Sequence, residues 1–178
     1  MDIRGTKTQE NLLRAFNVES EAKNKYEIYA AKAKKDGYEQ IAALFLETAR
    51  NEYAHSKLWF KLLRNGYPDT ADNLKAAANG GHYEWTEMYA TFAKEAREEG
   101  VEELAVKFEN GGKVERSHEA RYLRLLKNYK EGKTLKGDAP KGWKCRQCGF
   151  IYEGEEAPER CPTCGYPKAY FERMTENY

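Results

Sequence analysis

The 178-residue sequence contains little proline, cysteine or histidine, with five, four and three copies respectively. It also lacks an excess of one charge, because 30 basic residues are balanced by 29 acidic ones and the net charge is only +1. No overall field therefore favours nucleic acid or an anionic membrane, and we expect neither as a partner.

Long apolar runs are missing as well. Mean hydropathy is -0.93, and no stretch approaches the ~20 apolar residues that a membrane-spanning helix needs. The first residues, MDIRGTKTQENL, do not contain the apolar segment of a secretory signal. We therefore expect a cytoplasmic protein that does not associate with membranes.

Proline is almost absent from the stretch between Thr8 and Glu131, which is rich in the helix-forming residues Ala, Leu, Glu and Lys. Breakers that contain glycine interrupt this stretch near Asp36, Asn65 and Glu99. Such signals are typical of helix C-termini, so the pattern predicts four helices.

The connections between these helices differ in length. Those at Gly37 and Gly100 are short, which predicts antiparallel neighbours, whereas residues 66–72 are enough to carry the chain along a bundle. We expect residues 1–135 to form a mainly α domain, a four-helix bundle with one long crossover.

All four cysteines lie in residues 143–178, after a linker that we place at 136–142. Below roughly 40 residues a core is usually too small to keep a domain folded without a metal, disulfides or a partner. Two Cys-x-x-Cys turns, made by Cys145, Cys148, Cys161 and Cys164, can present four thiolates tetrahedrally. The segment is therefore expected to fold around a metal ion.

Tetrahedral sulfur alone does not separate zinc from iron. Disulfides are disfavoured in a cytosolic chain. Glycine follows the second cysteine of each pair, and Trp143, Tyr152 and Phe171 can form an apolar cover. These features suit an iron site whose sulfurs accept hydrogen bonds from backbone amides, while a zinc ion that only stabilises the fold is the alternative.

Acidic residues recur on the apolar stripes of the predicted helices. In LFLETARNEYAHSKLWFKLL the helical steps from Phe45 place Glu52 and His55 on one stripe, and Glu115 and His118 repeat this Glu-x-x-His spacing in VERSHEARYL. Lone carboxylates facing a core cost several kcal/mol unless a positive partner is present. A metal cluster is a partner of this kind.

The other two helices add further carboxylates. Glu19 lies on the inward row of the first helix, and Glu84 and Glu87 lie one turn apart in the third. One Glu from each of two helices plus Glu-x-x-His from the other two is the ligand set by which bundles hold two iron or manganese ions. The third histidine, His82, is outside this pattern, and a place on the helix surface or next to a ligand suits it better than ligation.

Charge counting gives the fifth carboxylate a role. Four carboxylates neutralise two Fe(II) ions, so Glu87 is surplus in the reduced state, whereas two Fe(III) ions with one hydroxo bridge are neutralised by five. We hypothesise that one iron exchanges the neutral His55 for the anionic Glu87 on oxidation. The alternative is that Glu87 only accepts a hydrogen bond beside the metals.

Glycines precede the ligands in two helices. Gly111 and Gly112 come just before Glu115, and Gly80 and Gly81 precede Glu84. Each Gly costs roughly 1 kcal/mol relative to Ala inside a helix. We expect either a locally loosened helix or a side chain packed against bare backbone, and close helix packing near the metals is the favoured explanation.

Together these segments resemble the rubrerythrin family. CRQCGFIYEGEEAPERCPTCGYPKAYF is similar to rubredoxin-type modules, and VESEA, NEYAH, EWTEMY and VERSH resemble the four ligand segments of the ferritin-like di-iron domain. The resemblance covers nearly the whole chain in order. It implies a ferritin-like four-helix bundle followed by a small rubredoxin-like domain of strands and loops.

The resemblance also implies an activity. Rubrerythrins are expected to be peroxidases that reduce hydrogen peroxide to water at a non-haem di-iron centre, with electrons relayed through an FeS4 centre. NADH is the implied ultimate donor, through a reductase or a rubredoxin. A homodimer is implied as well, with the FeS4 domain of one chain beside the di-iron site of the other.

Site residues follow from the same resemblance. It implies that Glu52 and Glu115 bridge the irons, and that Glu19 with His55 or Glu87 serves one iron. It implies that Glu84 with His118 serves the other iron. Glu87 and His55 are the residues expected to exchange as iron ligands during catalysis. The four cysteines hold the iron of the FeS4 centre.

Two other classes of protein fit the sequence less well. A ferritin-like protein that oxidises Fe(II) for storage does not need the electron-transfer module attached to this chain. A binding module with a zinc-stabilised tail would leave the inward Glu and His residues unexplained.

Overall fold

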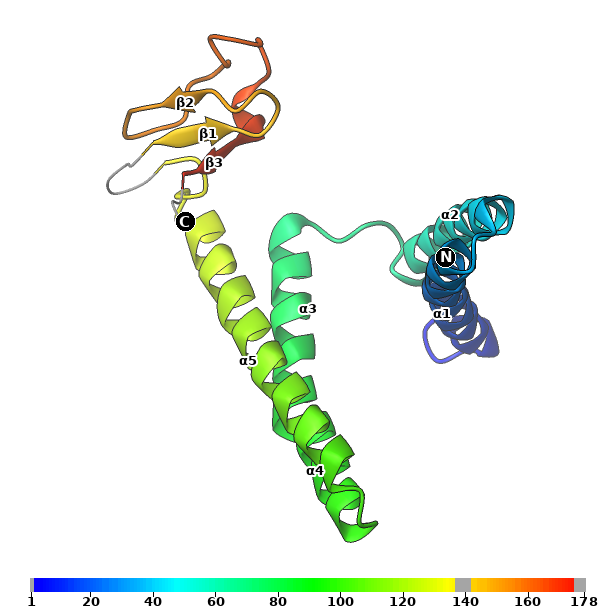
Figure 1. Cartoon of the computed structure of the whole chain (residues 1–178). Coiled ribbons are helices and arrows are strands. Elements are labelled where there is room, and N and C mark those ends of the chain that lie inside the picture. Colours follow the sequence, from blue (N-terminus) through cyan, green and yellow to red (C-terminus); the bar gives the residue numbers. More distant parts are fainter. Residues whose placement is uncertain (1, 137–141, 175–178) are drawn as a thin grey trace. The chain divides into compact units, whose positions relative to one another are not determined.

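The computed structural model describes residues 2–136 and 142–174. It is mainly helical, with a small three-stranded module that carries the four cysteines, as the sequence predicts (Figure 1). Most of the expected linker, residues 137–141, lies outside the described residues, as do residues 175–178. The described chain divides into two compact units, with the boundary in the sequence between Pro68 and Asp69.

The first unit is a pair of long helices, α1 (Lys7–Lys35) and α2 (Glu39–Leu63). Gly37 turns the chain between them with a φ of 85°, a left-handed conformation that favours glycine. Both predicted helix ends, near Asp36 and Asn65, are confirmed to within two residues.

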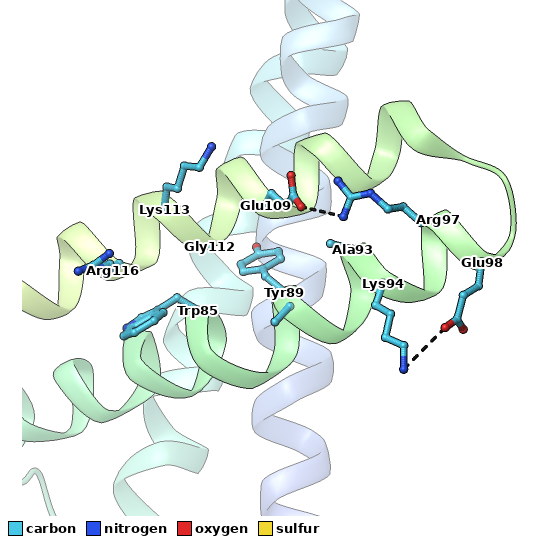
Figure 2. A pocket seen from close by; sticks show the side chains of 11 residues that line it. Trp85, Tyr89, Ala93, Lys94, Arg97, Glu98, Glu109, Gly112, Lys113 and Arg116 are labelled. Carbon is cyan, nitrogen blue, oxygen red and sulfur yellow. Dashed lines mark ion pairs between the residues drawn. The ribbon is translucent and has the colours of Figure 1, made fainter.

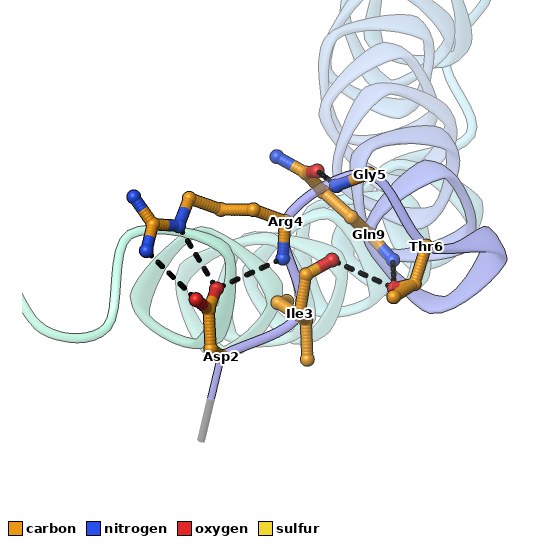
Figure 3. Close-up of polar contacts among 6 residues, drawn as sticks. All are labelled: Asp2, Ile3, Arg4, Gly5, Thr6 and Gln9. Atoms are coloured by element: carbon orange, nitrogen blue, oxygen red, sulfur yellow. Dashed lines mark hydrogen bonds and ion pairs between the residues drawn. The ribbon is translucent and has the colours of Figure 1, made fainter.

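The start of α1 is fixed by a local network (Figure 3). The Thr6 hydroxyl accepts a hydrogen bond from the Gln9 backbone N–H at 3.3 Å, and the Gly5 N–H donates to the Gln9 side chain at 2.8 Å. The first contact satisfies an amide group that a helix N-terminus leaves without an intrahelical partner, and the second ties the residue before the N-cap to the first turn.

Small residues bring α1 and α2 together. Ala30 and Ala33 are buried with Ala42, and Phe45 and Leu46 pack against them. The buried residues of α2 are Ala42, Ala49 and Ser56, spaced by seven. Phe45, which begins the predicted ligand stripe of α2, packs against the same buried cluster, so that stripe borders the contact with α1.

The second unit begins with α3 (Thr70–Tyr83), continues through a π-helical turn, η1 (Glu84–Met88), and α4 (Tyr89–Glu98), and returns through α5 (Glu102–Lys130). The sequence predicts a single third helix, and the π turn inside it was not expected. Ala93, Ala96 and Ala105 are buried between α4 and α5, with Phe108 packed against them.

Three of the four glycines near the predicted ligands lie at close contacts. A Cβ on Gly81 would lie 3.2 Å from the Glu115 carbonyl oxygen, and one on Gly111 would lie 3.2 Å from the Tyr89 ring. Gly112 lies against Tyr89 and Trp85, whereas a Cβ on Gly80 would have nothing within 4 Å. Both expected kinds of contact are present, and Gly80 takes part in neither.

The cysteine module contains a three-stranded antiparallel sheet in the order β2-β1-β3. Its strands are β1 (Trp143–Cys145), β2 (Ile151–Tyr152) and β3 (Phe171–Arg173), and a 3-10 turn, η2 (Lys168–Tyr170), precedes the last. Among the described residues, its hydrophobic core consists of five buried side chains, two of them cysteines: Trp143, Cys145, Ala157, Cys161 and Phe171. Metal ligands therefore form a large part of this core.

Candidate metal centres

The first candidate centre joins α1 to α2. Glu19 of α1 and Glu52 and His55 of α2 each place one ligand atom within 4.8 Å of the others. The His55 Nδ1 lies 2.9 Å from a Glu52 oxygen and 3.8 Å from a Glu19 oxygen. Three of the seven predicted ligands are thus gathered within one unit.

The two carboxylates of this group repel one another when no cation separates them. A hydrogen bond to Glu52, burial, and the charge of Glu52 together raise the pKa of Glu19, and only His55 opposes the shift. Like charges held this close need a proton or a cation between them. A divalent metal can supply that charge.

The second candidate centre joins η1 to α5 with the same residue types, Glu84 facing Glu115 and His118. The His118 Nδ1 lies 2.9 Å from a Glu115 oxygen. Burial, followed by the charge of Glu115 and a hydrogen bond to it, raises the pKa of Glu84. In each unit, a helical segment that carries one of the predicted carboxylates thus faces a helix that carries a Glu-x-x-His pair.

The short distance between the histidine nitrogen and the glutamate oxygen fits shared ligation. Histidine nitrogens and carboxylate oxygens lie about 2.1 Å from a divalent metal such as zinc, so two of them at right angles are about 3 Å apart. Both Glu-x-x-His pairs are at 2.9 Å. The donor set, carboxylates with imidazole, also suits iron and manganese.

Glu87 and His82 occupy different surroundings. Glu87 lies in the π turn, one turn after Glu84, and is exposed. His82 is at the end of α3, and its Nδ1 lies 2.9 Å from an oxygen of Glu119 on α5. His82 therefore contacts a carboxylate that the sequence did not single out, next to His118.

No spacing or motif in the sequence points to Glu119. Its two partners, His82 and Trp85, are 37 and 34 residues away. Such a contact depends on how two helices pack, and a single sequence does not contain that information.

The four cysteines form the third candidate centre. Their sulfurs lie within 4.8 Å of one another, with Cys145 3.8 Å from Cys164 and Cys148 3.6 Å from Cys161. The two turns have matching hydrogen bonds, since Cys145 N–H donates to the Phe150 carbonyl and Cys161 N–H to that of Tyr166, both at 2.8 Å. Cys145 and Cys161 are buried, Cys164 is half-buried and Cys148 is exposed.

Backbone amides contact these sulfurs. Burial acts to raise the pKa of Cys161, but the N–H groups of Cys164 and Thr163 and the neighbouring thiols outweigh it and lower the pKa to about 7. The Tyr166 N–H acts to lower the pKa of Cys164, but burial and the other three thiols raise it to about 12. The cluster thus favours a first thiolate and resists further ionisation until a cation is present, as expected of a metal site.

A groove of about 720 Å³ lies between α4 and α5 (Figure 2). Gly112 and Ala93 are among the residues that line it, together with Trp85 and Tyr89. An ion pair between Arg97 and Glu109 at 2.7 Å joins the two helices beside it. None of the predicted metal ligands lines this groove.

Among the described residues, no helix combines the length and the apolar character that crossing a bilayer requires.

Most of the chain is similar to known protein families. The family described as Rubrerythrin matches residues 10–126, and the one described as Rubrerythrin, rubredoxin-like domain, matches residues 143–172. Rubrerythrin-1 of Clostridium acetobutylicum is 48% identical over 99% of this chain and 98% of its own length. The rubrerythrin of Porphyromonas gingivalis is 44% identical over 99% of this chain and 94% of its own. A solved structure of nigerythrin in its fully reduced, all-ferrous state aligns with 94% of this chain and 86% of that chain, at 33% identity and a TM-score of 0.37.

Proposed function

Because the chain belongs to the rubrerythrin family, we propose that it is a peroxidase that reduces hydrogen peroxide to water at a di-iron centre. Its cofactors are a di-iron centre in the helical part and one iron held by the cysteine module. The observation that carries the proposal is the combination of two matching carboxylate-histidine groups with a four-sulfur cluster in one chain.

The residues present fit both cofactors. We assign the two irons to seven residues, and the FeS4 iron to the four cysteines. The seven are Glu19, Glu52, His55, Glu84, Glu87, Glu115 and His118. When bound, the di-iron centre supplies the two electrons that, with two protons, convert hydrogen peroxide to two waters.

The chain's own groups contribute charge and position. Four carboxylates, Glu19, Glu52, Glu84 and Glu115, balance the charge of two divalent ions. We assign Glu87 and His55 to the ligand exchange, because an anionic group suits the oxidised centre and a neutral one the reduced centre. The exposed position of Glu87 in the π turn leaves its side chain room to move.

The test is anaerobic stopped-flow spectroscopy of the full chain. The protein is reduced, mixed with peroxide or with dioxygen, and the absorbance of oxidised FeS4 is followed. We expect fast recovery of the red colour with peroxide and slow recovery with dioxygen. Glu87→Gln should slow the peroxide reaction, whereas Glu98→Gln, a matched change on the surface of α4, should not.

Two results would contradict the proposal. A colourless protein with zinc at its cysteines would remove the electron relay. Fast oxidation of many added Fe(II) ions per chain, without peroxide turnover, would instead favour the alternative, iron oxidation for storage.

Several accompanying expectations remain predictions. We expect the electron donor to be a rubredoxin or an NADH-dependent reductase. We also expect a homodimer, with the FeS4 domain of one chain near the di-iron site of the other, and a cytoplasmic location. The domain boundaries, 1–135 for the bundle and 143–178 for the module, are proposed on the same basis.

A further inference from the structure

Glu119 connects three parts of the second unit. Its carboxylate accepts a hydrogen bond from the Trp85 indole N–H at 2.5 Å and lies 2.9 Å from the His82 Nδ1. Trp85 belongs to the π turn, His82 to α3, and Glu119 to α5. The Glu119 side chain is only 17% exposed, so water replaces these contacts poorly if they are lost.

Glu119 also lies beside a close approach of the two helices. A Cβ on Gly81 would lie 3.2 Å from the Glu115 carbonyl oxygen and 3.5 Å from the Glu119 backbone nitrogen. The helix backbones are therefore in contact at the level of Glu115, and Glu119 joins their side chains one turn further along α5. A small rotation or slide of α3 against α5 would break one or both of its hydrogen bonds.

The π turn carries two of the proposed ligands, Glu84 and Glu87. A π turn is less stable than the α-helix that could replace it, so it persists where surrounding contacts hold it. Here the aromatic side chains at both ends are held, Trp85 by Glu119 and Tyr89 by its packing on Gly111. Arg116, whose guanidinium lies 5.5 Å from the centre of the Trp85 ring, adds a second contact from α5 to Trp85.

We propose that Glu119 is a positioning residue of the metal centre. By holding Trp85 and His82, it fixes the π turn against α5 and keeps Glu84 in register with Glu115 and His118. This inference rests on the metal ligation proposed above, but not on peroxidase activity. Glu119 itself is not assigned to the metal.

The test is Mn(II) binding by the full-length chain, followed through the electron paramagnetic resonance signal of free Mn(II). Manganese prefers carboxylate and imidazole to thiolate ligands, so the cysteine module does not compete for it. We expect Glu119→Ala to weaken Mn(II) binding by about 10- to 100-fold, the usual cost of losing a group that orients a ligand. Glu119→Gln, which keeps one carbonyl acceptor, should lose less.

Glu109→Ala is the matched control. Glu109 is also a carboxylate of α5, and it forms an ion pair at 2.7 Å with Arg97 of the preceding helix. We expect the Glu109→Ala variant to bind Mn(II) as tightly as the wild type. Trp85→Phe should weaken binding no more than Glu119→Ala, which also loses the contact with His82, and the double variant should lose no more than Glu119→Ala alone, because Trp85 acts through Glu119.

The outcomes separate the two proposals. If Glu119→Ala binds Mn(II) as tightly as the wild type, or if Glu109→Ala loses as much, the positioning role is wrong. Circular dichroism shows whether each variant is folded. If Glu119→Ala is unfolded, the Mn(II) affinity of Glu119→Gln tests the positioning role instead. Wild-type protein that binds no Mn(II) would refute the metal site and this inference together, whereas tight Mn(II) binding with no peroxide reduction would refute only the activity.

Discussion

Gly80 and Gly81 are neighbours in α3, and they should respond in opposite ways to the same substitution. Gly80 is exposed, and an added Cβ would have no atom within 4 Å, whereas at Gly81 it would lie 3.2 Å from a backbone oxygen of α5. Both replacements by alanine remove the same helix-propensity cost. Their difference therefore isolates the contact between the two helices.

The magnitudes follow from these two environments. Gly80→Ala should raise the free energy of unfolding by about 1 kcal/mol, the propensity difference between Gly and Ala. Gly81→Ala gains the same helix propensity, but its added Cβ would press on the Glu115 carbonyl, which belongs to a helix and moves only with it. Overpacking of this kind typically costs about 1 to 3 kcal/mol, so we expect Gly81→Ala to be less stable than Gly80→Ala by that amount.

Thermal unfolding of the metal-free chain, followed by circular dichroism, measures the difference. For a chain of this size, 1 kcal/mol corresponds to roughly 2 to 4 °C in Tm. Gly81→Ala should also weaken Mn(II) binding, because separating α3 from α5 moves Glu84 away from Glu115. Equal stabilisation by both substitutions would refute the close helix contact.

Three further outcomes are expected. Cys161→Ser should abolish the iron-dependent red colour and unfold the cysteine module, measured by absorbance and by the dispersion of its proton resonances, while helical circular dichroism is retained. Gly111→Ala should stabilise the chain less than an unhindered glycine replacement does, because its Cβ would lie 3.2 Å from the Tyr89 ring; thermal unfolding tests this. Glu19→Gln should stabilise the metal-free protein at pH 7, because the raised pKa of Glu19 means that its ionisation disfavours the folded state. Urea unfolding should show that this advantage in the free energy of unfolding disappears as the pH falls below the usual carboxyl pKa of 4.5. An advantage that persists in acid would contradict the repulsion between Glu19 and Glu52.

The sequence was informative where a site is built from local spacing. Glu52 and His55, like Glu115 and His118, are three residues apart on one helix, and that spacing alone brings their ligand atoms to 2.9 Å. The two Cys-x-x-Cys turns are local in the same way. Helix ends were predictable because glycine marks them.

Features that depend on packing between helices were not predictable. The π turn at Glu84–Met88 inserts into a segment whose composition is ordinary for an α-helix. The role of Glu119 depends on partners more than thirty residues away. Gly80 and Gly81 could not be distinguished by sequence, since only the neighbouring helix decides which of them needs to be glycine.

The unequal exposure of the four sulfurs determines how the cysteine module would be damaged. Cys145 and Cys161 are buried, so an oxidant or chelator reaches the cluster first at the exposed Cys148. Oxidation of that sulfur beyond the sulfenic state is irreversible without a dedicated repair enzyme. Since metal ligands make up much of the small core, loss of one sulfur would unfold the module, and a protein damaged in this way would bleach and become a substrate for proteases.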